Sequence, residues 1–261
     1  HITVHRNHLF LSFPGGSLQH SSPGNPYDWE AILGAAELSI GHDITGIFSA
    51  GQGTRAVFGR NTGAILYGYS VDDWDLVVLS EDAGCIEWTA QMIVQPIYMD
   101  DQGLRSLSAT QAFGDFRMGT ISHLVEPIFP AKRAAGTTAV ASVRVRSKAQ
   151  YRIFFSDSTG LSVSFHAKNP EIMPFDLDLR VYAICSSEDS SGNEVIFFGS
   201  DDGYVYQLDS GTSFDGDEIE AYIRLPFNHV GSPTQNKRWH KATLEVDADP
   251  TIEIAMVPEY D

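Results

Sequence analysis

The sequence predicts an all-β protein, a β-propeller (complete or partial) followed by a β-sandwich-like segment. Four stretches rich in Val, Ile, Phe and Tyr are each interrupted by a short turn that ends in glycine. The four turns end at Gly63, Gly103, Gly160 and Gly203, which lie 40, 57 and 43 residues apart. One propeller blade occupies about 40 to 50 residues, so the spacing fits one hairpin per blade. Each glycine is expected to supply the positive φ that closes a hairpin.

Short apolar segments predict the remaining strands in order. A first hairpin is expected from residues 2–4 and 9–13 around Arg6-Asn7. Further strands are predicted at 44–49, 55–58, 64–67, 76–79, 92–98, 104–107, 139–146, 151–155, 161–165, 179–184, 195–198 and 204–208. A helix-like pattern covers 29–38 with Gly34 at its centre, whereas 14–27 and 111–136 are expected to be loops or insertions.

The pattern changes near residue 214. Residues 218–225 and 238–246 alternate between apolar and polar side chains and lack the glycine turns of the preceding segments. We therefore expect propeller blades with loop insertions over 1–213 and the start of a sandwich-like unit over 214–261, with a boundary between Gly211 and Asp217. The chain begins without Met and ends in an unfinished strand pattern, which suggests a piece of a longer polypeptide.

Composition limits the classes of function. The chain has 34 acidic and 17 basic side chains, a formal charge of −17, which argues against specific nucleic-acid binding, although DNA could pass nearby unbound. Cys85 and Cys185 are too few for a disulfide framework, and two small buried thiols are favoured over a bond or a redox pair. The longest apolar stretches are short and interrupted, so we expect neither a signal peptide nor a membrane span. The protein is therefore expected to be made in the cytoplasm.

Several motifs resemble cofactor or metal sites but lack the neighbouring elements or ligands that such sites need. Gly51-Gln52-Gly53-Thr54-Arg55-Ala56 matches a dinucleotide fingerprint, but a hairpin rather than a helix follows it, so a turn is favoured. His5 and His8 are spaced by three across a predicted turn, with no third ligand nearby in the sequence. The acidic turns at 201–203 and 215–218 lack the ligand pattern of a calcium loop. The sequence therefore predicts no cofactor, no metal and no catalytic residues.

One motif favours an enzyme. Residues 80–84 (SEDAG) followed by Trp88 resemble the Asp box of sialidase-like propellers, although Glu87 departs from that motif and the box occurs once. A glycosidase would also need arginines for an acidic sugar and a Tyr–Glu pair, or two facing carboxylates. The alternative function that stays open is a glycan-binding or glycan-cleaving propeller of a receptor-binding apparatus.

Longer segments resemble structural propeller proteins of tailed bacteriophages. The resemblance spans roughly residues 2–247 and rests on 5–12 (HRNHLFLS), 23–29 (PGNPYDW), 41–47 (GHDITGI), 97–107 (IYMDDQGLRSL), 198–209 (FGSDDGYVYQLD), 224–233 (RLPFNHVGSP) and 237–239 (KRW). In such proteins the propeller forms part of the tail adaptor, hub, tube or stabilisation machinery. WD-repeat propellers differ, because Gly41-His42 and Trp74-Asp75 each occur once here.

This resemblance implies a non-enzymatic structural component of the virion, located in the tail or neck and made in the host cytoplasm. Its expected partners are other virion proteins and copies of itself in a ring. The candidate partner contacts are Arg224, Phe227, Lys237, Arg238 and Trp239, because Arg and aromatic residues concentrate the binding energy of interfaces. The competing interpretation places Phe227 and Trp239 in a sandwich core with the charges in water.

Overall fold

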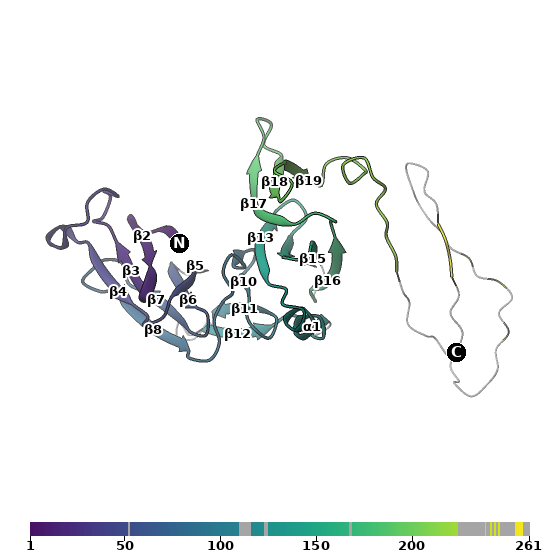
Figure 1. Ribbon diagram of the computed structural model, residues 1–261. Helices are drawn as coiled ribbons and strands as arrows, with labels where there is room; N and C mark the ends of the chain where they lie inside the picture. Colours follow the sequence, from purple (N-terminus) through teal and green to yellow (C-terminus); the bar gives the residue numbers. More distant parts are fainter. Residues whose placement is uncertain are drawn as a thin grey trace. The chain divides into compact units, whose positions relative to one another are not determined.

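The computed structural model confirms the all-β prediction. It describes residues 1–51, 53–109, 116–122, 125–166, 169–223, 238, 241, 243, 245 and 254–257. The chain divides into two compact units between Gly216 and Asp217. The first unit, His1–Gly216, holds five antiparallel sheets whose strands follow one another in chain order (Figure 1).

The first two sheets have four strands each. The first sheet consists of β1 (Ile2–His5), β2 (His8–Phe13), β3 (Ser17–His20) and β4 (Ala36–Ser39). The second consists of β5 (Ile44–Gly51), β6 (Thr54–Gly59), β7 (Gly63–Tyr67) and β8 (Asp75–Ser80). The β1–β2 hairpin turns at Arg6 and Asn7, which both have positive φ, as the favoured two-residue hairpin turn requires.

The other three sheets repeat this meander. The third contains β9 (Gln91–Met92), β10 (Pro96–Met99), β11 (Leu104–Ala109) and β12 (Phe116–Thr120). The fourth contains β13 (Ala139–Val145), β14 (Gln150–Phe155), β15 (Thr159–Ser164) and β16 (Glu171–Asp176). The fifth contains β17 (Val181–Glu188), β18 (Glu194–Ser200) and β19 (Val205–Leu208). The predicted strand at 92–98 is thus two short strands.

Consecutive sheets pack face to face, as propeller blades do. The first strand of each sheet contacts the first strand of the next, in the series β1, β5, β9, β13 and β17. Each neighbouring pair of sheets shares one buried apolar cluster, and the four clusters centre on Phe10 with Val57, Phe58 with Tyr98, Ile97 with Ile153, and Phe154 with Phe198. Burying one such side chain stabilises the fold by about 1.5–3 kcal/mol.

The middle strands read as continuous apolar runs because both faces of these sheets are buried. On β6, Ala56 and Phe58 belong to the cluster with the third sheet, whereas Val57 belongs to the cluster with the first. On β14, Ile153 faces the third sheet and Phe154 the fifth. A sheet enclosed on both sides needs no alternation between apolar and polar residues.

Two of the four predicted glycine turns were interpreted wrongly. Gly103 and Gly203 have positive φ, as expected, but Gly63 and Gly160 do not and are strand residues of β7 and β15. A Cβ at position 63 would lie 2.5 Å from the Phe58 ring, and one at position 160 would overlap the Phe175 ring. These two glycines are required by close packing of aromatic rings rather than by turn geometry.

The three segments expected to lack strands also differ from the prediction. Within 14–27 the structure has β3, and within 29–38 it has a 3-10 turn at Ala31–Leu33 followed by β4, because Gly34 adopts a φ of 95° and ends the turn. Within 111–136 it has β12 and α1 (Ile128–Ala134), whose Phe129 is buried among residues of the third and fourth sheets.

The second unit, Asp217–Asp261, is described over few residues. Its described residues, 217–223, 238, 241, 243, 245 and 254–257, belong to no strand, and Tyr222 and Ile223 are exposed. The predicted strand at 218–225 is not formed by its described residues, 218–223, and the predicted strand at 238–246 is described at 238, 241, 243 and 245 alone. The sandwich-like segment therefore stays a prediction.

Candidate functional site

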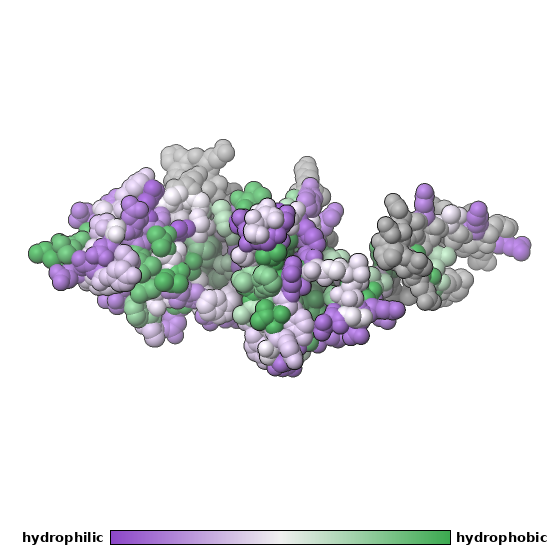
Figure 2. Space-filling model, turned by 90° about the horizontal axis from the view of Figure 1, so that it is seen from above, coloured by the Kyte–Doolittle hydropathy of each residue, from purple (hydrophilic) through white to green (hydrophobic). Residues whose placement is uncertain are grey.

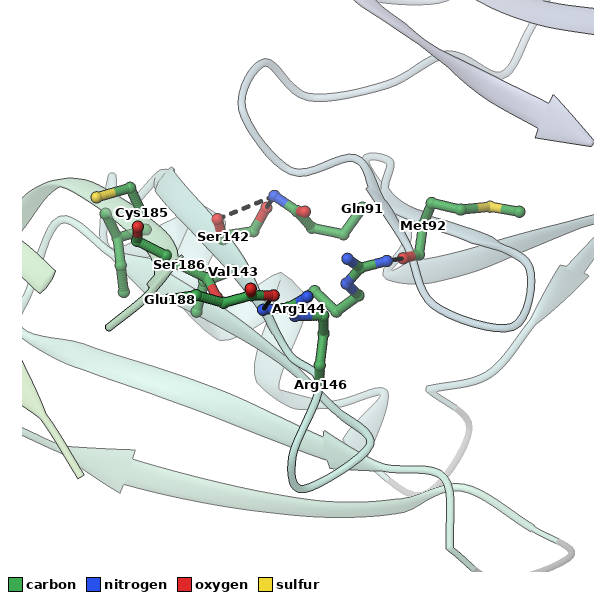
Figure 3. A pocket seen from close by; sticks show the side chains of 11 residues that line it. Gln91, Met92, Ser142, Val143, Arg144, Arg146, Cys185, Ser186 and Glu188 are labelled. Carbon is green, nitrogen blue, oxygen red and sulfur yellow. Dashed lines mark hydrogen bonds and ion pairs between the residues drawn. The ribbon is translucent and has the colours of Figure 1, made fainter. Parts of the chain in front are cut away.

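An open polar groove of about 690 Å³ lies along the first strands of three sheets. It is formed by β9, β13 and β17 and their flanking turns, and its eleven lining residues are Gln91, Met92, Ser142, Val143, Arg144, Arg146, Ile184, Cys185, Ser186, Ser187 and Glu188 (Figure 3). In a propeller the first strands of the blades line the central channel. The groove therefore lies along the strands that would line such a channel.

The alternation of β13 places its polar side chains in this groove. Ala141, Val143 and Val145 are buried in the cluster shared with the fifth sheet. Their neighbours Ser142 and Arg144 point to the opposite face, since successive side chains of a strand alternate.

Hydrogen bonds fix the groove between the third and fourth sheets. Gln91 Nε2 donates to Ser142 O at 3.0 Å and to Ser142 Oγ at 3.1 Å, and Ser142 Oγ donates to Trp88 O at 2.7 Å. Arg144 Nη1 donates to Met92 O at 2.9 Å. The side chains of this wall are therefore held in place before any ligand arrives.

The other end of the groove is an ionic contact between the fourth and fifth sheets. Arg146 Nη2 lies 2.6 Å from Glu188 Oε1, and Arg146 Nε lies 3.4 Å from Glu194 Oε1. Burial would raise the pKa of Glu194, but the backbone N–H groups of Ser147 and Arg146, at 2.8 and 2.9 Å, and the Ser186 hydroxyl outweigh it and lower that pKa to about 2. Glu194 thus stays ionised and joins two sheets.

The described residues that line this groove do not include a pair of carboxylates. Of the eleven described residues that line it, Glu188 is the single carboxylate, and it is paired with Arg146. Hydrolysis by an acid and a nucleophile or base requires two carboxyl groups about 5–10 Å apart. None of these eleven residues is a tyrosine that could serve as an alternative nucleophile.

The predicted partner contacts fall almost entirely outside the described part of the chain. Arg224, Phe227, Lys237 and Trp239 are not among the described residues. Arg238 is described and exposed. Whether the five form one surface stays a prediction.

The two histidines considered as metal ligands do come together. His5 and His8 face each other across the β1–β2 hairpin, and His20 from β3 joins them, a third histidine that the sequence spacing did not reveal. All three are buried against Phe10 and Trp74. Within the described residues, no group of three His, Cys, Asp or Glu side chains is placed to hold a metal ion.

The other motifs are structural turns. Gly51 ends β5 and Gly53 directly precedes β6, and both have positive φ, so a hairpin turn stands in place of a dinucleotide loop. In the turn after β18, Asp202 accepts hydrogen bonds from Tyr204 N at 2.9 Å and from the Tyr206 hydroxyl at 2.5 Å.

The two cysteines differ in their exposure to solvent. Both cysteines are free; Cys85 is buried, as expected, but Cys185 is exposed. Among the helices of the described residues, none is long and apolar enough to cross a membrane.

Sequence reasoning missed the groove itself. The signal was present at residues 143–146 (VRVR), where two arginines alternate with valines on a predicted strand of an acidic chain. That pattern indicates one basic and one apolar face. It did not indicate which other strands would complete the groove, because Gln91 and Glu188 are more than 40 residues away in the sequence.

Comparisons with known proteins bear on the fold alone. No protein family and no curated protein matches this sequence. Among solved structures, the chain is similar to the N-terminal domain of Nup159, with a TM-score of 0.50 and 8% sequence identity. The similarity covers 80% of this chain and 60% of that one, so this chain spans less than two thirds of the neighbour's length. That neighbour is a nucleoporin β-propeller, and the likeness assigns this chain the propeller fold.

Proposed function

We propose that this protein is a non-enzymatic structural component of a tailed-phage virion that acts through protein–protein assembly in the tail or neck. The observation that carries the proposal is the resemblance of residues 2–247 to phage structural propellers, on a chain whose fold is propeller-like. Partners are other virion proteins and further copies of this chain. No cofactor takes part.

Exposed apolar side chains on the two terminal sheets support an assembly role. Figure 2 shows apolar residues (green) at the surface among hydrophilic ones (purple). On the first sheet Ile2 and Val4 are 69% and 62% exposed, and on the fifth sheet Val205 is 73% exposed. In the described residues, no buried cluster joins the fifth sheet to the first. Apolar groups left on sheet faces are typical of surfaces that a partner covers.

Detection of the chain in purified particles tests this proposal. Mass spectrometry of gradient-purified virions should identify its peptides, and immunogold labelling with an antibody raised against residues 1–216 should mark the tail or neck. Absence of the chain from virions, with its presence in the infected-cell lysate, would overturn the proposal.

The groove gives some support to the alternative, glycan binding by a receptor-binding propeller. Arg144 and Arg146 lie in it together with Gln91 and several serines, and these are groups that bind sugar hydroxyls and carboxylates. A glycan array probed with the intact chain and with Arg144→Ala separates the two functions. Binding that the substitution abolishes favours the alternative, and an array without signal favours assembly.

A further inference from the structure

Three histidines and a tryptophan form a buried cluster between the first and second sheets. His5, His8 and His20 come from β1, β2 and β3 and are 6%, 2% and 0% exposed. Trp74 directly precedes β8 of the second sheet, and its ring centroid lies 5.6–5.8 Å from the ring centroids of all three imidazoles. The cluster thus lies where the first sheet packs on the second.

Two of these imidazoles share one hydrogen-bond acceptor. His8 Nδ1 lies 2.6 Å and His20 Nδ1 3.1 Å from the carbonyl oxygen of Ser21, and the two Nδ1 atoms are 3.2 Å apart. Two neutral imidazoles fit this arrangement when each carries its single proton on Nδ1, because both Nδ1–H groups then point at the Ser21 oxygen and both Nε2 atoms are unprotonated. Two imidazolium ions would place two positive charges at this distance, which is unfavourable away from water.

Two arginines near the cluster add to this repulsion. Arg55 on β6 donates from Nη2 to Val4 O at 2.7 Å, and Arg6 in the β1–β2 turn stacks on Tyr69 at 4.1 Å and donates to Gly53 O. The carboxylate of Asp73, the residue before Trp74, accepts from the backbone N–H groups of Tyr69 and Ser70. The Nε2 atoms of His5 and His20 are buried and have no hydrogen-bond partner among the described residues.

We propose that this cluster is a proton-operated contact: acidification charges His5 and His20 and releases the first sheet (β1–β4) from the second (β5–β8), while the third to fifth sheets stay folded. The device goes beyond the proposed function and does not depend on it. The first sheet can open locally because one buried apolar cluster and the two arginine hydrogen bonds join it to the second sheet.

The direction of the pH effect follows from proton linkage. Burial, with the fields of Arg55, Arg6 and His8, lowers the pKa of His5 from 6.5 to about 4, and burial also lowers the pKa of His20. The released sheet therefore binds more protons than the packed one, so the packed state loses stability as the pH falls from about 6.5 towards 4. At pH 4.5, His5 alone should favour release by roughly ten- to a hundredfold.

Hydrogen exchange of the intact chain at pH 7 and 4.5, corrected for intrinsic rates, tests the proposal. We expect peptides from β1–β3 to lose at least about tenfold in protection at pH 4.5 and peptides from β13–β15 to keep theirs. His5→Phe, which keeps a ring against Phe10 and Trp74, should retain the protection of β1–β3, whereas the control His42→Gln, at an exposed site, should behave as the wild type. Equal loss in all sheets, or the same loss in His5→Phe, overturns the proposal.

An NMR titration of the wild-type imidazoles decides the matter if the variant fails to fold. A midpoint for His5 near 4, accompanied by loss of the first sheet's native resonances, supports the proposal. A midpoint near 6.5 with native resonances unchanged overturns it.

Discussion

The phenyl ring of Phe175 on β16 lies against Gly160 on β15, its cross-strand partner, in the space that a Cβ at position 160 would occupy. Gly63 on β7 stands in the same relation to the ring of Phe58 on β6. In both hairpins an aromatic side chain takes the space left by the glycine and extends the buried cluster. Two sheets thus use the same device at the start of their third strand.

Gly160→Val should therefore lower the free energy of unfolding by roughly 3 kcal/mol, because the new side chain meets the Phe175 ring and the backbone of Ile153. Urea denaturation monitored by circular dichroism measures the change. Gly199→Val on β18 is the matched control, since nothing lies within 4 Å of a Cβ there. Equal losses in the two variants would contradict this account of Gly160.

Glu194→Gln should destabilise the contact between the fourth and fifth sheets by about 2 kcal/mol at pH 7, because the carboxylate accepts hydrogen bonds from Ser147, Arg146 and Ser186. Since the folded pKa of about 2 lies below the ordinary 4.5, the stabilisation is complete above pH 4.5 and is lost as the pH falls towards 2. The difference from the wild type should vanish near pH 2. The control Glu37→Gln, at an exposed position on β4, should change the free energy of unfolding little at any pH. An effect of Glu194→Gln that does not depend on pH would refute the ionic role of Glu194.

The two thiols should react at very different rates. Burial raises the pKa of Cys85 to about 12, whereas Cys185 is exposed in the groove. Ellman's reagent at pH 8 should therefore modify one thiol rapidly in the native protein and the second only after denaturation. Cys185→Ser should remove the rapid phase, and a rapid phase that survives this substitution would contradict the assignment.

Much of the fold follows from the sequence. Strands such as β6 and β14 were predicted because Val, Ile and Phe run through them without interruption, as burial on both faces permits. Strands β3, β4, β12 and β16 were missed. β3 follows Pro14-Gly15-Gly16, and β16 contains Pro174, which an outer strand tolerates because it pairs on one side only.

The groove was not predictable to the same extent. Its alternating arginines were visible in the sequence, but their partners Met92 and Glu188 come from other sheets. The histidine cluster shows the same limit, because His20 reaches His8 through pairing of β3 with β2, inside a segment that composition assigned to a loop. Contacts between distant strands depend on register, which the spacing of residues does not supply.

Trp239→Ala addresses the predicted partner contacts. If Arg224, Phe227, Lys237, Arg238 and Trp239 form an interface, the variant should stay folded in residues 1–216 and fail to enter particles or rings, at a cost of about 2 kcal/mol or more for a central anchor. Thermal denaturation and incorporation into virions are the two readouts. Global unfolding supports the alternative that Trp239 fills a core, and normal assembly with normal stability defeats both interpretations.

Cryo-electron microscopy of the intact virion tests the central claim most directly. The account predicts that density in the tail or neck fits the five sheets of residues 1–216, with β1, β5, β9, β13 and β17 as the first strands in contact. A map in which every chain of the tail and neck is assigned to other sequences, with no density for these sheets, would contradict it.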